Sequence, residues 1–206
     1  MFLLSDTDLA GKVLGCADGP AGFNAGMARH SRSIISCDPL YQFSTAQIRQ
    51  RIDETYADVI AQTYLNLDRF VWTDIPSVEE LGRLRLSAMN EFLEDFDRGK
   101  REGRYVVAEL PDLPFSDRAF DLALCSHFLF LYSPLLSLEF HRRAIAAMCA
   151  VAREVRIFPL LTFDADVSPY LDSILKGLSE SGRNVSVERV AYEFQRGGSE
   201  MLRILS

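Results

Sequence analysis

Apolar and polar residues alternate along the chain with two different periods. Stretches in which apolar residues recur every three or four positions predict helices, and short apolar runs between them predict buried strands. Strands that alternate with helices favour a parallel sheet with right-handed crossovers. The apolar runs lie at residues 12–16, 33–37, 105–108, 120–126, 155–160, 184–190 and 201–205, and a helical pattern over residues 22–30 follows the first.

The last two predicted strands have only a short link between them, which contains Gly197 and Gly198, so we expect an antiparallel hairpin. The second and third strands are separated by more chain than one crossover helix needs. Two capping-box sequences, Ser44-Thr-Ala-Gln47 and Ser77-Val-Glu-Glu80, precede apolar residues at helical spacing. We predict a two-helix insertion over residues 44–100 within one domain of residues 1–206. It forms either a lid or wall over a substrate, or an elaborated helix pair of the core.

Composition narrows the class of protein. Hydrophobic residues make up 48% of the 206 residues and charged residues 25%, which is typical of a soluble globular protein. The net charge of −7 argues against binding to nucleic-acid phosphates. No apolar run approaches the roughly 18 residues of a membrane span. The four cysteines lie far apart, which favours buried thiols in a reducing, cytoplasmic location over disulfides or a zinc site.

We predict no functional site at two further groups of polar residues. Asp164 and Asp166 have no third ligand at a matching spacing, so we predict no metal. His30 and His141 fall in predicted helices, where we expect them at the surface.

A cluster of small residues follows the first predicted strand, in the sequence VLGCADGPAGF from Val13 to Phe23. Small side chains where a strand turns into a helix let a ligand approach the backbone. Asp38 ends the second strand 19 residues after Gly19, and an acidic residue at about this spacing can accept hydrogen bonds from two ribose hydroxyls. The alternative is an ordinary turn residue before Pro39. The dinucleotide-binding pattern G-x-G-x-x-G does not match well, whether it is aligned from Gly15 or from Gly19.

The segment VAELPDLPFSDRAFDLAL, from Val107 to Leu124, resembles the third- and fourth-strand region of class I S-adenosylmethionine-dependent methyltransferases. The matching residues are Glu109, Leu113-Pro114-Phe115 and Phe120-Asp121. VLGCADGPAGF resembles the first motif of that family, and CDPLY resembles the second. The resemblance covers most of the chain except residues 44–100. It implies an α/β, three-layer Rossmann-like fold with a mainly parallel seven-stranded sheet in the order 3-2-1-4-5-7-6, the last strand antiparallel.

The first motif departs from the family pattern at two positions. Gly15 occupies the acidic position, and Ala17 occupies the first of three small positions. We expect Asp18 to replace the missing carboxylate near the cofactor's amino group, and Ala17 to avoid the positive φ that glycine allows. The resemblance implies an S-adenosyl-L-methionine site formed by Ala17, Asp18, Gly19, Asp38, Pro39, Leu40, Glu109, Leu110, Ser126 and His127.

Roles within this site follow from the resemblance. Asp38 binds the ribose, and Pro39 and Leu40 pack against the adenine. Glu109 accepts from the adenine amino group, and the backbone N–H of Leu110 donates to a ring nitrogen. Asp121, in contrast, is expected to shape the start of the fourth strand rather than touch the ligand.

No residue is assigned to catalysis. His127 is a candidate general base because an unperturbed histidine has a pKa near 6.5. The alternative is a histidine that orients the backbone or lines the pocket, since methyl transfer often needs only proximity and alignment. Trp72, Tyr132 and Arg196 are candidates for the substrate pocket, although Arg196 also fits a hairpin turn.

We expect methyl transfer from S-adenosylmethionine to an unidentified acceptor, most simply a small molecule, with no nucleic-acid or membrane partner. Three alternatives stay open. The altered first motif at Gly15 and Ala17 suits a non-catalytic protein that binds the cofactor. A nicotinamide-dependent oxidoreductase is the second, and an interaction protein that uses the helical insertion as its partner face is the third.

Overall fold

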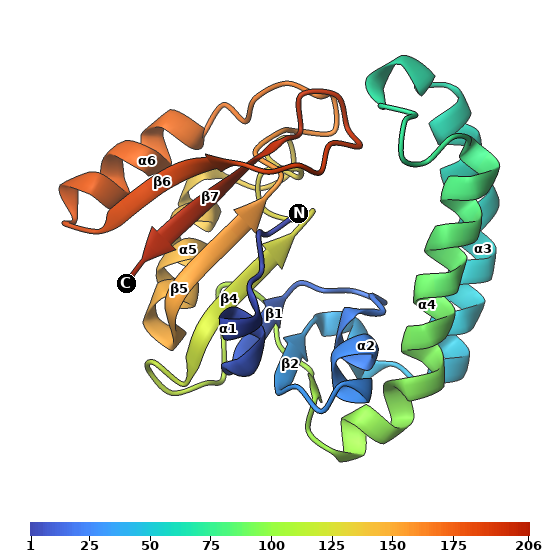
Figure 1. Cartoon of the computed structure of the whole chain (residues 1–206), viewed down its shortest axis with the longest axis horizontal. Helices are drawn as coiled ribbons and strands as arrows, with labels where there is room; N and C mark the ends of the chain where they lie inside the picture. The colour runs from blue at the N-terminus through green and yellow to red at the C-terminus, as the bar shows by residue number, and fades with distance from the viewer.

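A seven-stranded sheet forms the centre of the computed structural model, which describes residues 1–206 (Figure 1). Its order is β3-β2-β1-β4-β5-β7-β6, and β7 is antiparallel to both β5 and β6 while the other pairs are parallel. The predicted order and the antiparallel last strand are therefore confirmed. The strands are β1 (Val13–Cys16), β2 (Ile34–Cys37), β3 (Tyr105–Val106), β4 (Phe120–Ser126), β5 (Ala152–Phe158), β6 (Asn184–Arg189) and β7 (Glu200–Leu205).

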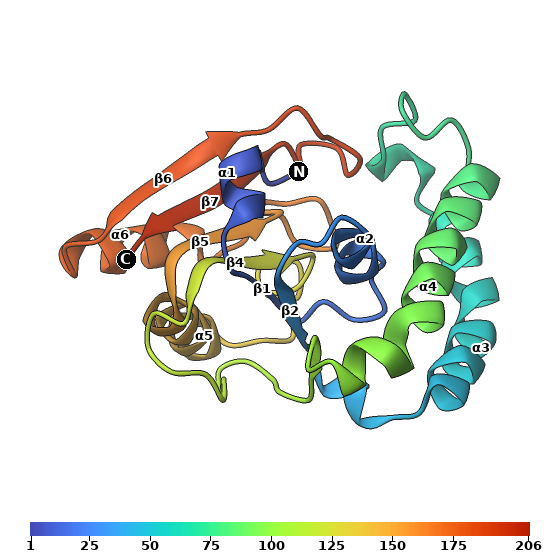
Figure 2. The same cartoon turned by 60° about the horizontal axis from the view of Figure 1, so that its bottom comes forward.

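Helices cover both faces of the sheet (Figure 2). The helices α5 (Leu138–Val151) and α6 (Leu171–Glu180) pack on one face, over a cluster of 22 buried residues. The helices α1 (Asp6–Ala10) and α2 (Phe23–Arg29) lie on the other face, over a smaller buried cluster. These three layers agree with the predicted fold class.

His141 in α5 is fully buried, so the prediction of a surface position is wrong. Its two ring nitrogens lie 2.8 Å from the backbone oxygens of Ser137 and Leu129, and its ring packs beside Phe130 and Tyr170. The N–H of a neutral imidazole can donate to one of these two oxygens, and a helical pattern alone does not reveal such a partner. All four cysteines are free and buried, as expected.

The predicted insertion consists of α3 (Thr45–Tyr64) and α4 (Val78–Arg101), which stand beside the sheet in Figure 1. Each helix begins where the sequence predicts, because the Ser44 hydroxyl accepts from the Gln47 N–H and the Ser77 hydroxyl accepts from the Glu80 N–H. Two 3₁₀ turns, η1 (Pro39–Gln42) and η2 (Leu67–Arg69), precede and follow α3. An aromatic cluster of Tyr41, Phe92, Phe96 and Tyr105 fixes the base of the insertion to the sheet.

The tip of the insertion is attached to the loop between β6 and β7. The Val71 N–H donates to the Phe194 oxygen at 2.8 Å, and the Arg196 N–H donates to the Arg69 oxygen at 2.8 Å. The ring of Phe70 stacks on Phe194, with centroids 5.0 Å apart. We call Phe70, Trp72, Phe194 and Arg196 the tip clasp. Figures 1 and 2 both show these segments side by side, so the insertion is held at both ends.

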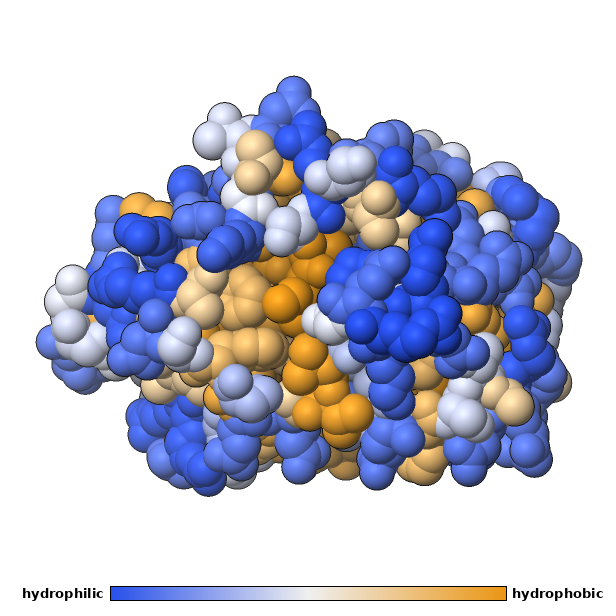
Figure 3. Space-filling model, turned by 90° about the horizontal axis from the view of Figure 1, so that it is seen from below, coloured by the Kyte–Doolittle hydropathy of each residue, from blue (hydrophilic) through white to orange (hydrophobic).

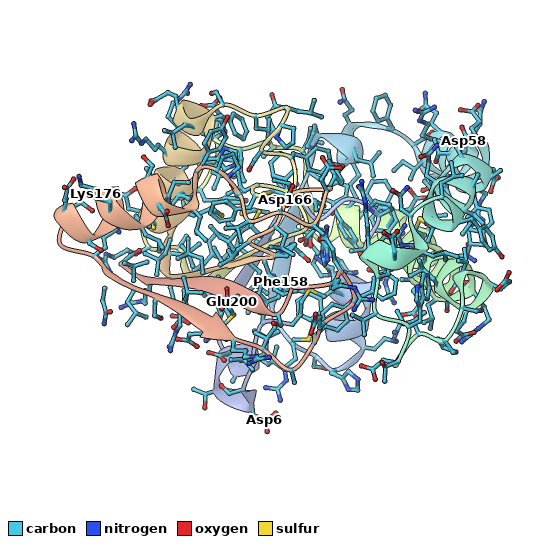
Figure 4. The ribbon with its side chains drawn as sticks, turned by 90° about the horizontal axis from the view of Figure 1, so that it is seen from above. Asp6, Asp58, Phe158, Asp166, Lys176 and Glu200 are labelled. Atoms are coloured by element: carbon cyan, nitrogen blue, oxygen red, sulfur yellow. The ribbon has the colours of Figure 1, made fainter.

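The β6–β7 loop, which contacts the tip of the insertion, lies at the edge of the sheet where β4 and β5 end (Figure 1). Figure 4 looks onto this edge, with Phe158 at the end of β5 between the hairpin that carries Glu200 and α3, which carries Asp58. The opposite side, in Figure 3, shows a strip of hydrophobic surface between hydrophilic regions. None of the helices combines the length and the apolar character of a membrane span.

Candidate functional site

The turn between β1 and α2 has a backbone shape that small residues favour. Ala17 has φ +55° and Gly19 has φ +57°, so the expectation that Ala17 avoids positive φ is wrong. A non-glycine residue in this region costs about 1–2 kcal/mol. Hydrogen bonds from the Ala17 N–H to the Cys37 oxygen and from the Gly19 N–H to Asp38, both 2.9 Å, hold the turn against that cost.

The carboxylate of Asp18 folds back over the backbone of Gly15. A β-carbon built on Gly15 would overlap this carboxylate, which only glycine leaves room for. The Ser36 hydroxyl on β2 donates to Asp18 Oδ2 at 2.5 Å. Desolvation, with a smaller contribution from the charge of Asp38, raises the pKa of Asp18 to about 6, although the Ser36 hydrogen bond opposes this shift. A carboxylate is thus present beside position 15, supplied from three residues later.

Asp18 is connected to the base of the insertion through buried polar side chains. The Asn24 side chain donates to the Ser36 hydroxyl at 3.1 Å, and Arg104 donates to the Asn24 oxygen at 2.6 Å. Arg104 also pairs with Asp95 of α4 at 2.6 Å. Because each group has a partner, the network fixes the Asp18 carboxylate relative to α2, β2 and α4.

Asp38 joins the end of β2 to the same turn. Its Oδ2 accepts from the Gly19 N–H at 2.9 Å, and its Oδ1 accepts from the Leu40 N–H at 2.7 Å. Desolvation raises the pKa of this half-buried carboxyl, and the two backbone donors oppose the shift. Asp38 caps η1, which agrees with the alternative of a turn residue. A carboxylate has about four acceptor positions, so capacity for two hydroxyl donors remains.

Ser126 and His127 stand at the end of β4. His127 has φ +53°, and its N–H donates to the Phe158 oxygen at 2.7 Å. Its Nδ1 lies 2.8 Å from the Ser126 hydroxyl. Desolvation, together with the positive charge of Arg85, lowers the pKa of His127 to about 4. The imidazole is therefore neutral at physiological pH.

Two hollows flank the turn. The first, the sheet-edge cavity, has a volume of about 600 Å³ and is lined by Met1, Phe2, Leu3, Leu4, Gly15, Asp18, Ala21, Phe23, Leu124, Ser126, His127 and Ala191. The second, the insertion cavity, has a volume of about 560 Å³ and is lined by Asp18, Pro20, Ala21, Leu40, Ile48, Arg51, Ile52, Thr55, Tyr56, Val59, Ile60, Arg85, Ala88 and Met89. Asp18 and Ala21 line both, so the cavities adjoin at the turn.

The structure places some predicted cofactor residues away from these cavities. Asp38 and Pro39 line neither one, although Asp38 binds the turn directly. Glu109 is exposed beyond the end of β3, and Leu110 is buried in the larger core cluster. Asp121 accepts from the Lys12 N–H at 2.9 Å near the start of β4, which confirms its predicted local role.

The three residues predicted for the substrate pocket make other contacts. Trp72 lies in the tip clasp, where it packs edge-on against Phe194. Arg196 donates to the backbone oxygens of Asp68 and Phe70, both at 3.1 Å, and so holds the tip of the insertion. Tyr132 packs edge-on against Phe163, with ring centroids 4.5 Å apart. None of the three lines either cavity.

Three residues of the site have no clear signal in the sequence. Ser36 lies inside an apolar run, and Arg51 and Arg85 are charged positions on amphipathic helices, where solvent-facing arginines are usual. Arg51 and Arg85 are far from Asp18 in the sequence. They line the same cavity as Asp18 only after the chain has folded.

Known proteins of similar sequence or structure show which fold this arrangement belongs to. No family model matches the chain. It is 29% identical over 206 residues to an uncharacterized protein of Methanocaldococcus jannaschii, covering 99% of this chain and 90% of that protein. Among solved structures it is similar to magnesium protoporphyrin IX methyltransferase from Synechocystis PCC 6803 with bound SAM, with a TM-score of 0.51 and 12% identity over 97% of this chain and 72% of that one. The methyltransferase domain of bacterial CtHen1-C gives a TM-score of 0.51 and 10% identity over 97% and 91%.

The chain has the class I methyltransferase fold. In an open α/β sheet, ligands bind outside the carboxyl ends of the strands, where the strand order reverses. In this class I fold the reversal lies between β1 and β4. Gly15, Ser126 and His127 come from the ends of these strands and line the sheet-edge cavity.

Proposed function

We propose that this protein binds S-adenosylmethionine and transfers its methyl group to a small-molecule acceptor. The observation that carries the proposal is the pair of cavities that adjoin at Asp18 and Ala21. Group transfer requires two molecules bound side by side, and each cavity has a volume suited to a small ligand. An insertion held at its base and its tip favours a small acceptor over a macromolecule, because it leaves a bounded hollow.

The residues at the turn fit the proposed cofactor. Ionised Asp18 offers a negative charge to a cationic amino-acid group, and Asp38 retains acceptor positions for ribose hydroxyls. No atom lies within 4 Å of a β-carbon placed on Gly19, so the turn is open to a ligand there. The solved magnesium protoporphyrin IX methyltransferase, whose fold this chain shares, has SAM bound. When bound, the cofactor supplies an electrophilic methyl group.

Residues of this chain would position the acceptor and accept its proton. His127 is neutral, and when its Nδ1 carries the proton and donates to Ser126, its Nε2 is available as an acceptor. With a pKa of about 4 it is a weak base, so the main contribution expected from the site is alignment. The insertion adds a wall that limits the access of water.

Calorimetry tests the cofactor first. S-adenosylhomocysteine should bind the purified protein in a one-to-one ratio, and NAD should not. Binding of NAD alone would support an oxidoreductase. Transfer of a labelled methyl group from S-adenosylmethionine, assayed over a panel of small acceptors, then tests the reaction. The glycine at position 15 favours one second candidate, a non-catalytic protein that binds the cofactor; tight binding without transfer to any acceptor would support it.

A further inference from the structure

The insertion cavity is lined by an apolar helical face that the rest of the protein leaves open. Ile52 and Val59 of α3 face it, together with Ala88 and Met89 of α4. Among the α3 residues that line the cavity only Ile48 is buried, and Val59 is 40% exposed. An apolar surface hollowed to about 560 Å³ between two helices and a turn is typical of a ligand pocket.

Arg85 of α4 lines this cavity without a carboxylate partner. Two other arginines of the helix are paired, Arg83 with Glu80 and Arg98 with Asp95, each at 2.5 Å, whereas Arg101 at the end of the helix is unpaired but lies outside the cavity. Arg85 is an exposed residue that forms no ion pair, and desolvation lowers the pKa of its guanidinium. In a chain with 29 acidic residues and a net charge of −7, a guanidinium without an ion-pair partner is available to an external anion.

The charge of Arg85 also acts on residues outside the insertion cavity. Its charge acts on His127, which lines the sheet-edge cavity, and on Tyr192 of the β6–β7 loop. The guanidinium therefore lines the insertion cavity within electrostatic reach of His127 in the sheet-edge cavity. Arg51, which also lines the insertion cavity, differs from Arg85 because it has a carboxylate partner, Glu54, at 3.6 Å. One unpaired cation suits a monoanion better than a doubly charged phosphate.

We propose that the acceptor is a carboxylic acid with an apolar body, whose carboxylate pairs with Arg85 while its body packs against α3 and α4. The role as acceptor rests on the proposed methyl transfer, whereas the binding of the acid does not. The planar guanidinium matches a carboxylate in a bidentate pair, and the apolar walls select the remainder of the molecule. The carboxylate of S-adenosylmethionine is the other group that can pair with Arg85, and the experiment below distinguishes these two ligands.

Decanoate and decanol form a matched pair of ligands that differ in charge. Each should be titrated against wild-type protein, R85Q and R83Q, with displacement of fluorescent N-phenyl-1-naphthylamine as the readout. R83Q removes the same charge from the same helix outside the cavity. Decanoate should displace the probe from wild type and R83Q at a roughly tenfold lower concentration than from R85Q. Decanol should act equally on all three.

Three results would overturn the proposal: no binding of the probe or decanoate to wild type, equal displacement by decanoate and decanol, or an unchanged response in R85Q. Calorimetry of R85Q with S-adenosylhomocysteine adds the second arm. Unchanged affinity supports the acid site, and lost affinity assigns Arg85 to the cofactor's carboxylate instead. If wild type does not bind S-adenosylhomocysteine but binds decanoate through Arg85, the proposed methyl transfer fails while the acid site stands.

Discussion

The carboxylate of Asp18 occupies the space beside Gly15 that the side chain of any larger residue at position 15 would fill. The two positions are therefore coupled: the acid can stand at residue 18 only because residue 15 has no side chain. Glycine at position 15 departs from the first motif of the family, but it leaves room for the carboxylate of Asp18.

Substitution of Gly15 should test this coupling. G15A should destabilise the protein by roughly 1–3 kcal/mol, because the added methyl group overlaps the Asp18 carboxylate. In D18A/G15A the overlap is gone, so a double-mutant cycle from urea unfolding should give an interaction energy of about 0.5–3 kcal/mol. Gly177→Ala, in a helix with nothing within 4 Å of the new β-carbon, is the control and should not destabilise. Strict additivity of G15A and D18A would contradict the coupling.

The raised pKa of Asp18 predicts a pH dependence of cofactor binding. At a pKa of about 6, Asp18 is ionised above pH 6 and protonated below it. If the ionised form pairs with the ammonium group of S-adenosylhomocysteine, affinity should be flat above pH 7 and fall by up to about tenfold for each pH unit below 6. Calorimetry between pH 5 and 8 measures this.

Two comparisons isolate Asp18 in that titration. Methylthioadenosine lacks the amino-acid group, so its affinity should not follow the same curve. Asp18→Asn should bind S-adenosylhomocysteine weakly at every pH, because the charge is absent. A pH profile that D18N leaves unchanged would show that another group titrates.

Asp38 should be required for binding of the adenosyl group. Asp38→Asn keeps the size of the side chain but removes the charge that two backbone donors and the proposed ribose hydroxyls share. Each hydrogen bond to a charged group contributes about 1.5–3 kcal/mol, so the affinity for S-adenosylhomocysteine should fall at least roughly tenfold. Asp121→Asn, which also accepts from a backbone N–H but near the start of β4, should bind normally. Equal affinities of the two variants would remove Asp38 from the site.

Local features made most of the fold predictable from the sequence. A strand or a helix start depends on residues close together in the chain, as at Ser44 and Ser77, whose hydroxyls cap the helices that they precede. The resemblance supplied the sheet order, which local patterns do not contain. To predict the packing at the base of the insertion, both the local patterns and the sheet order are needed, because Tyr41 and Tyr105 meet only when β2 and β3 are neighbours.

The site was less predictable because its contacts join distant segments. The sequence shows that Trp72 is a large aromatic residue, but not that Phe194 lies against it far along the chain. It shows that Arg196 is a cation, but not that backbone oxygens of the insertion accept from it. The role of Arg85 depends on a missing partner, and no sequence pattern records which arginine on a helix lacks one.

The tip clasp should control the opening of the insertion. Arg196→Ala removes two hydrogen bonds to the tip, each contributing about 0.5–1.5 kcal/mol. The amide of Val71, which donates to Phe194, should then exchange hydrogen faster, while amides of the β4 and β5 strands keep their protection. Mass-resolved hydrogen exchange of residues 65–77 measures this. Arg142→Ala, which breaks a bond to Ser173 between α5 and α6, is the control, and equal exchange in both variants would contradict the clasp.

The ionisation of His127 should report its distance from Arg85. Desolvation and the positive charge of Arg85 together lower the pKa of His127 to about 4. Removing the charge in R85Q should raise this pKa, yet leave it below the ordinary value near 6.5, because the desolvation remains. Nitrogen-15 spectra of the imidazole rings, assigned with H127N, follow the titration. R83Q should leave it unchanged, since Arg83 is paired with Glu80 on another face of α4. An identical His127 titration in R85Q and wild type would mean that the charge of Arg85 does not act on His127, and the acid site would lose its connection to the sheet-edge cavity.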